Sequence, residues 1–143
     1  MSTQRNLAVG VFAAAILAVG GASAAAQTKW DLSTVWPDGN FHTKNATRFA
    51  EEVKKATNGG VEITVKAGGQ LGFKGPEHLR AVRDGLVPMA DVLNIQQIGD
   101  EPVLGTEGIP FLVASAEELK VLHKYLRPVF EQVAAKNNQK IIY

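Results

Sequence analysis

Segments with the two-residue period of a β-strand alternate along this chain with segments that have the period of an α-helix. Residues 29–36 and 61–65 alternate in side-chain character, which predicts strands, and residues 89–93 predict a third, more buried strand. Helical spacing of apolar residues begins near residue 40 and again at Pro76. This order predicts an α/β fold in which a mostly parallel sheet is flanked by helices on both faces.

The expected helices have identifiable ends and inner faces. The first starts at Asn40 or Thr43 and ends at Asn58-Gly59-Gly60, whose residues tolerate the left-handed backbone conformation. Its buried stripe is expected to consist of Ala46, Phe49, Ala50 and Val53. The inner face of the second is expected to consist of Leu79, Val82 and Leu86.

The last third of the chain predicts a loop, a long helix and the beginning of a strand. Residues 94–108 are irregular and predict loop and short helix. Ser115-Ala116-Glu117-Glu118 is a capping box that opens a helix, and Pro128 should kink that helix or divide it in two. Residues 140–143 predict a further strand with no partner segment after it, so we expect the chain to be a truncated piece of a longer protein.

The N-terminus has the pattern of a cleavable secretory signal peptide. Arg5 supplies the positive end, residues 7–19 carry no charge, and small residues at 22–26 fit a signal peptidase. An apolar run of ~13 residues is short for a transmembrane helix, which needs ~20. We therefore expect residues 1–26 to be a signal peptide, residues 27–143 to form one domain, and the mature protein to be periplasmic.

Composition excludes several classes of function. Without residues 1–26, which contain only Arg5 among charged residues, 14 Lys and Arg stand against 14 Asp and Glu, so nucleic acid is not an expected partner. The chain has no cysteine, which excludes disulfides and thiol chemistry. No histidine lies in a zinc-binding pattern, and we expect no metal and no cofactor.

Catalysis would need a base, and the imidazoles available are His42, His78 and His123. None lies in a known hydrolase pattern, and each is interpreted as a surface or capping residue rather than a ligand. His42 is the exception, because it lies where the first strand's loop enters the first helix. The chain is not expected to be an enzyme; the alternative is a periplasmic α/β enzyme that uses His42 with a carboxylate such as Asp38.

Three loops that follow predicted strands are the best candidates for ligand binding, because open α/β sheets bind ligands at the carboxyl ends of their strands. Trp36 offers a flat apolar face after the first strand, although packing under the loop explains it equally well. Gly68-Gly69-Gln70-Leu71-Gly72 follows the second strand and lacks the ending of a phosphate-binding loop. Asn94 follows the third, where turn formation is an equal alternative. The expected substrate-binding residues are Trp36, His42, Gln70 and Asn94.

Several of these segments, taken in order, resemble a known family. The matching segments are Phe49-Ala50-Glu51-Glu52-Val53, Thr57 to Ile63, Gly68 to Gly72, Ala81 to Val92 and Ile109-Pro110-Phe111-Leu112. They are similar to the N-terminal lobe of solute-binding proteins of tripartite ATP-independent periplasmic (TRAP) transporters. Two departures from the family pattern are Lys66-Ala67, where many relatives have an aromatic residue and a proline, and Pro88.

The resemblance implies the first lobe of a two-lobed periplasmic binding protein that closes around an organic acid. It implies that the protein hands this carboxylate ligand to membrane permease subunits driven by an ion gradient. It also implies that the main substrate anchor is an arginine of the second lobe, whose guanidinium binds a carboxylate through two hydrogen bonds. That second lobe would lie beyond Tyr143.

Overall fold

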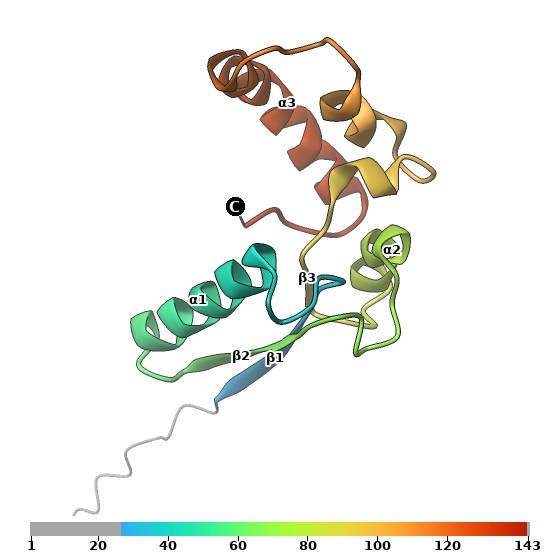
Figure 1. Ribbon diagram of the computed structural model, residues 1–143. Helices are drawn as coiled ribbons and strands as arrows, with labels where there is room; N and C mark the ends of the chain where they lie inside the picture. Colours follow the sequence, from blue (N-terminus) through green and yellow to red (C-terminus); the bar gives the residue numbers. More distant parts are fainter. Residues whose placement is uncertain (1–26, 143) are drawn as a thin grey trace, which may run out of the picture.

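The computed structural model describes residues 27–142, so the expected signal peptide lies outside the described residues. Three parallel strands form the sheet in the order β2-β1-β3 (Figure 1). They are β1 Thr28–Ser33, β2 Val61–Lys66 and β3 Met89–Ala90. The predicted parallel sheet flanked by helices is confirmed, although the first strand ends three residues early and the third is only two residues long.

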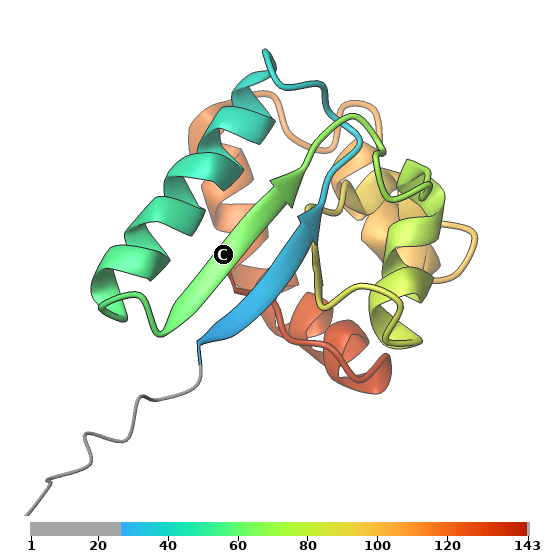
Figure 2. The same cartoon turned by 90° about the horizontal axis from the view of Figure 1, so that it is seen from below.

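Helix α1, Phe41–Ala56, covers one face of β1 and β2 (Figure 2). The side chain of Asn40 caps it by accepting a hydrogen bond from the His42 N–H at 2.9 Å. Asn58 and Gly59 follow it with positive φ angles of 49° and 79°, as the sequence predicts. The buried cluster between helix and sheet consists of Leu32, Ala46, Ala50 and Ile63, with Phe49 and Val53 packed against it.

Helix α2, His78–Arg83, follows the single turn η1, Gly75–Glu77, and lies beside β3 (Figure 1). It contacts the opposite side of β1, because Ser33 points away from α1 and meets His78. Leu79 is buried as predicted, but the expectation for Leu86 is wrong, since 65% of that side chain is exposed. The helix ends at Arg83 and Gly85 has a φ of 72°, so the helical period stops before Leu86.

Residues 94–108 form two 3₁₀ segments, η2 Asn94–Gln97 and η3 Pro102–Gly108, before the long helix α3, Ala116–Lys136. Ser115 caps α3, its hydroxyl accepting a hydrogen bond from the Glu118 N–H at 3.1 Å. Pro128 does not divide the helix, because Leu126 and Phe130 on either side of it are buried against Leu79 and Leu104. Within residues 27–142, no helix is both long and apolar enough to cross a bilayer.

The predicted fourth strand is absent from the described residues, where 139–142 are extended coil. A strand needs a neighbour for its backbone hydrogen bonds, and none of the sheet's strands pairs with this segment. It is attached instead through its side chains: Gln139 donates a hydrogen bond to the Leu79 carbonyl, and Ile141 packs against the cluster of α2, η3 and α3. The prediction failed because the sequence shows strand propensity but not whether a partner exists.

Candidate functional site

The loops that follow β1, β2 and β3 start at the same edge of the sheet, because the three strands are parallel. Residues 34–40, 67–74 and 91–97 therefore bound one end of the molecule, as the sequence predicts. None of these segments contains an arginine, and the only lysine is Lys74 at the end of the second. The rim formed by these loops is almost free of positive charge.

Trp36 and His42 form the aromatic part of this rim. Their rings stack with centroids 4.9 Å apart and planes 14° apart, and the Phe41 ring lies 4.1 Å from His42 on a tilted plane. The Thr43 hydroxyl donates a hydrogen bond to the Trp36 carbonyl at 3.0 Å, which ties the loop to the first turn of α1. Trp36 is half-buried, so it is neither a core residue nor a fully exposed one.

The glycine loop after β2 lies beside the Trp36 loop. Gly68 donates its N–H to the Trp36 carbonyl at 2.8 Å, and Gly69 donates to the Thr34 carbonyl at 3.0 Å. Both glycines have positive φ angles, 61° and 72°, which explains why the chain uses glycine here. The loop places Gln70 at the surface, with its side chain exposed next to the aromatic pair's loop.

The glycine loop cannot act as a phosphate cradle in this conformation. Such a cradle needs several backbone N–H groups that are free to point at an anion. Here the N–H groups of Gly68, Gly69, Gln70 and Gly72 all donate to carbonyl groups of the protein. The loop therefore shapes the rim and presents Gln70, and it offers no anion-binding nest.

A buried polar cluster lies directly beneath the rim and joins β1, α2 and β3. The His78 Nδ1–H donates to the Asp91 carbonyl at 3.2 Å, which leaves Nε2 to accept from the Ser33 hydroxyl at 3.1 Å. The Thr34 hydroxyl donates to the Asp91 carboxylate at 3.2 Å. Only 1% of His78 is exposed, and this desolvation lowers the pKa of His78 against the opposing effect of Asp91.

The interpretation of His78 as a surface residue is therefore wrong. It begins α2 in the same stripe as Ala81 and Val82, at helical spacings of three and four, and this stripe is the signal that could have placed it inside. With Ser33 fully buried, the hydrogen-bonded pair has no route to a substrate. Its role is to fix the strand ends from which the rim loops start.

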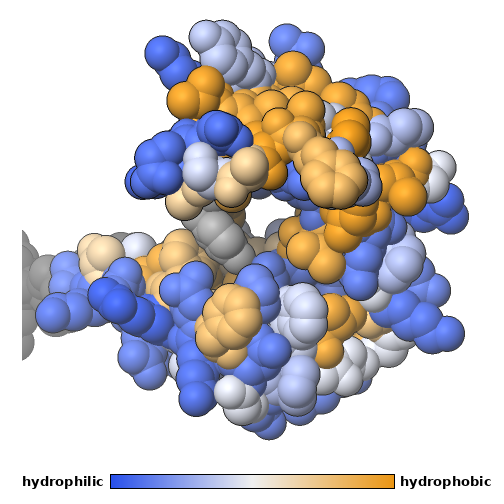
Figure 3. Space-filling model, turned by 45° about the horizontal axis from the view of Figure 1, so that its top comes forward, coloured by the Kyte–Doolittle hydropathy of each residue, from blue (hydrophilic) through white to orange (hydrophobic). Residues whose placement is uncertain are grey.

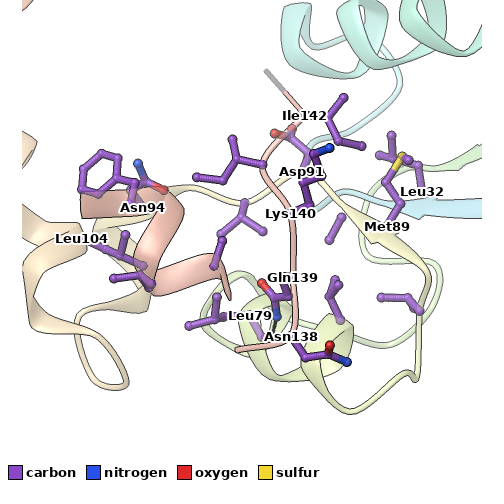
Figure 4. Close-up of a pocket in the computed structure, with 18 of the residues that line it drawn as sticks. Leu32, Leu79, Met89, Asp91, Asn94, Leu104, Asn138, Gln139, Lys140 and Ile142 are labelled. Atoms are coloured by element: carbon purple, nitrogen blue, oxygen red, sulfur yellow. Dashed lines mark hydrogen bonds between the residues drawn. The ribbon is translucent and has the colours of Figure 1, made fainter. Parts of the chain in front are cut away.

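Asn94 lies apart from the other three predicted site residues. Its side-chain N–H donates to the Glu107 carboxylate at 3.2 Å, and Glu107 also pairs with His123 of α3. In the described part of the chain no hydrogen bond connects Asn94 with Trp36, His42 or Gln70. Asn94 instead lines a cavity of about 870 Å³ between β3, α3 and residues 139–142 (Figure 4).

Comparison with known proteins identifies the family of this chain. Residues 32–142 match the model of bacterial extracellular solute-binding protein, family 7, also called DctP. The chain belongs to this family. No curated protein was found to match it significantly.

Solved structures of TRAP-type solute receptors have the same fold as this family 7 chain. DctP6 of Bordetella pertussis, an extracytoplasmic solute receptor binding pyroglutamic acid, matches over 81% of the chain with 30% identity and a TM-score of 0.77. DctP7 of the same organism, a receptor that also binds pyroglutamic acid, matches over 77% with 37% identity and a TM-score of 0.73. A marine metagenome TRAP solute binding protein specific for pyroglutamate matches over 78% with 34% identity and a TM-score of 0.73.

These relatives are much longer than the family 7 chain described here. The chain spans 38%, 36% and 36% of the three matched structures. All three are solute receptors. The family therefore supports the binding hypothesis over the enzyme hypothesis.

The enzyme hypothesis also lacks the contact that it requires. No hydrogen bond or ion pair within residues 27–142 joins His42 to Asp38 or to another carboxylate, whereas a catalytic pair must lie within hydrogen-bond reach. The His42 ring instead stacks on Trp36 and contacts Phe41. The same described residues contain no group of three or more acidic or histidine side chains able to hold a metal ion.

Proposed function

We propose that residues 27–143 form the first lobe of a periplasmic TRAP solute-binding protein and supply half of a crevice for a small organic acid. The observation that carries this proposal is the membership in family 7, together with three pyroglutamate-binding relatives at 30–37% identity. The protein would be exported by its signal peptide and would deliver the solute to membrane permease subunits. It would have no catalytic role.

The proposed contacts are uncharged. The edge of the Trp36–His42 stack would contact the apolar part of the solute, and Gln70 would donate or accept a hydrogen bond. Asn94 would join the crevice only if η2 moved, because it now donates to Glu107. A carboxylate needs a positively charged partner to bind tightly, and the rim loops contain no arginine. This deficit fits a second lobe that brings an arginine when the two lobes close.

The proposed solute class is the one that the relatives bind. Pyroglutamate combines a small apolar ring, an amide and one carboxylate. The ring suits an aromatic face, the amide suits amide side chains, and the carboxylate suits a guanidinium. The first lobe alone would contact the ring and the amide and would leave the carboxylate in water. We therefore expect the chain to bind pyroglutamate with a Kd on the order of 1 mM.

Tryptophan fluorescence during a pyroglutamate titration tests this proposal. Trp36→Phe should abolish the fluorescence change, and Trp30→Phe, which alters a tryptophan outside the rim, should keep it. 2-Pyrrolidinone, which lacks the carboxylate, should give nearly the same response as pyroglutamate, because the first lobe does not recognise the carboxylate. Loss of the response in Trp30→Phe but not in Trp36→Phe would refute the proposed site, and sub-micromolar binding by this chain would refute the shared-lobe account.

A further inference from the structure

We propose that Gln97 is a positioning residue, which ties the loop of Gln70 to the turn of Asn94 so that the two amide side chains act on one solute together. This role rests on the proposed function, because Gln70 and Asn94 matter here as solute contacts. Gln97 itself would touch no solute. Three observations support the role: the burial of Gln97, the hydrogen bond that it donates, and the two rim loops that this bond joins.

Gln97 is a buried amide in a molecule whose hydrophilic side chains lie mainly at the surface. Figure 3 shows such side chains over the lower half of the molecule, where water can complete their hydrogen bonds. Only 1% of Gln97 is exposed. Its Nε2 donates to the Gly75 carbonyl at 2.8 Å, whereas its Oε1 has no hydrogen-bond partner among residues 27–142. A buried acceptor of this kind lowers stability, so stability alone does not explain a glutamine at this position.

The bond between Gln97 and Gly75 joins the second rim loop to the third. Gly75 directly follows residues 67–74, and Gln97 is the last of residues 91–97. The neighbouring Gln96 packs on the same glycine, because a Cβ at Gly75 would overlap with the Gln96 Oε1. The two loops therefore meet at one buried point, and glycine is needed there for the close approach.

The loop that carries Gln70 is held at both ends. At its start, two glycine N–H groups donate to carbonyls of the first rim loop. At its end, the Lys74 N–H donates to the Glu77 carboxylate at 2.7 Å, and the next residue, Gly75, accepts from Gln97. The position of Gln70 therefore depends on both ends, and Gln97 holds one of them.

The turn that carries Gln97 also carries Asn94. These two residues are the last and the first of η2. Asn94 donates to Glu107 of η3 and Gln97 donates to Gly75, so the turn is held from two sides. Asn94 reaches the crevice only if η2 moves, and that movement would pull on Gly75 and on the loop before it. Solute contacts at Gln70 and Asn94 should therefore be coupled through Gln97.

Gln97→Met tests this role, because methionine has a similar length and no hydrogen-bond donor. The Gly75 carbonyl keeps the bond that it accepts from the His78 N–H, and the unpaired buried oxygen is removed, so the Tm should change little. The Kd for pyroglutamate, measured by tryptophan fluorescence, should rise about fivefold, which is the net contribution of one neutral hydrogen bond. Gln139→Met is the matched control. Gln139 also donates to a backbone carbonyl, that of Leu79, but lies outside the rim, so this Kd should stay the same.

Amide hydrogen exchange without solute measures the same role independently of binding. In Gln97→Met the amides of Gln70 and Lys74 should exchange about tenfold faster, because one end of their loop is released. The amide of Gly68, which is bonded to the first rim loop, should keep its rate.

A second variant disturbs the same contact from the other segment. Gly75→Ala places a Cβ against the Gln96 Oε1, so this side chain or the whole of η2 must shift. The exchange rates of the Gln70 and Lys74 amides should rise as they do in Gln97→Met, and so should the Kd.

The outcomes separate this role from the proposed function. If the unaltered chain does not respond to pyroglutamate, the proposed function is refuted, and the exchange rates in Gln97→Met then decide the role of Gln97. Unchanged exchange of the Gln70 and Lys74 amides would overturn that role. It would also be overturned if the unaltered chain binds and Gln97→Met binds equally well. Equal weakening by Gln97→Met and Gln139→Met would overturn it too, since both variants would then act through the stability of the whole fold.

Discussion

Acidification should destabilise this chain through one buried histidine. His78 is neutral in the folded protein, with Nδ1–H donating to the Asp91 carbonyl and Nε2 accepting from Ser33, and burial lowers its pKa below the ordinary 6.5. In the unfolded chain the imidazole takes up a proton near pH 6.5, whereas in the folded chain it resists protonation. Stability is therefore unaffected above pH 6.5 and falls as the pH decreases from 6.5 towards the lower folded-state pKa.

The magnitude follows from the linkage of one proton. If the folded protein stays unprotonated at His78, the free energy of unfolding at pH 5.5 is lower by up to about 1.4 kcal/mol than at neutral pH. A difference of 1 kcal/mol shifts the Tm of a domain of this size by about 4–8 °C. The pKa of Glu101 is lowered by its hydrogen bonds with Asn137 and Lys136. Carboxylates of this kind lose their contribution to stability only below about pH 4.5, which is outside the pH range in which His78 acts.

Urea unfolding followed by circular dichroism between pH 7.5 and 5.5 measures this effect. His78→Asn should be less stable at pH 7.5 but should show almost no change between the two pH values. Leu86→Ala, which changes an exposed side chain that does not titrate, should keep the pH dependence of the original chain. An unchanged pH slope in His78→Asn would refute the reasoning.

Three further predictions concern the fold. Leu32→Ala should lower the free energy of unfolding by about 2–5 kcal/mol because Leu32 is buried, at 2% exposed. The control Leu86→Ala, at an exposed side chain, should change this free energy by less than about 0.5 kcal/mol. Equal effects of the two variants in urea unfolding would contradict the core described here. Gly68→Ala should lower the free energy of unfolding by about 1–2 kcal/mol, because the φ of 61° at this position disfavours a side chain. Gly39→Ala should change it very little, because a Cβ there would meet no other atom within 4 Å. An unchanged melting temperature in Gly68→Ala would count against the loop conformation. Ser115→Ala should lower the free energy of unfolding by about 1 kcal/mol because it removes the cap of α3, and Ser115→Asp should keep the cap. Equal melting temperatures for the two variants would argue against capping.

Periodic patterns predicted most of the fold because they record which side chains face the core. The stripe of α1 and the alternation of β2 appear in the structure as expected. β3 was overestimated because an apolar run does not show where backbone pairing stops, and only Met89 and Ala90 pair with β1. The strand expected at residues 140–143 failed for a related reason, since its formation depends on a neighbour that the local sequence cannot reveal.

The candidate site was predictable in position but not in detail. The rule that ligands bind at the carboxyl ends of parallel strands located the loops of Trp36 and Gln70, which the structure places side by side. It could not show that Asn94 turns towards Glu107, because that contact spans 13 residues of irregular chain. The buried role of His78 was also missed, since a polar residue within an apolar stripe can be read either way until its partners are known.

Backbone amide chemical shifts recorded while pyroglutamate is added to the chain test the central claim most directly. We predict that the amide shifts of residues 34–43 and 67–74 change and reach saturation at millimolar concentrations of pyroglutamate. The shifts of residues 91–97 should change less, and those of Ile109 and Tyr125 should not change. Shifts confined to residues 139–142, which line the cavity beside β3, would contradict this claim, and so would no shift at any residue up to about 50 mM pyroglutamate, well above the expected Kd.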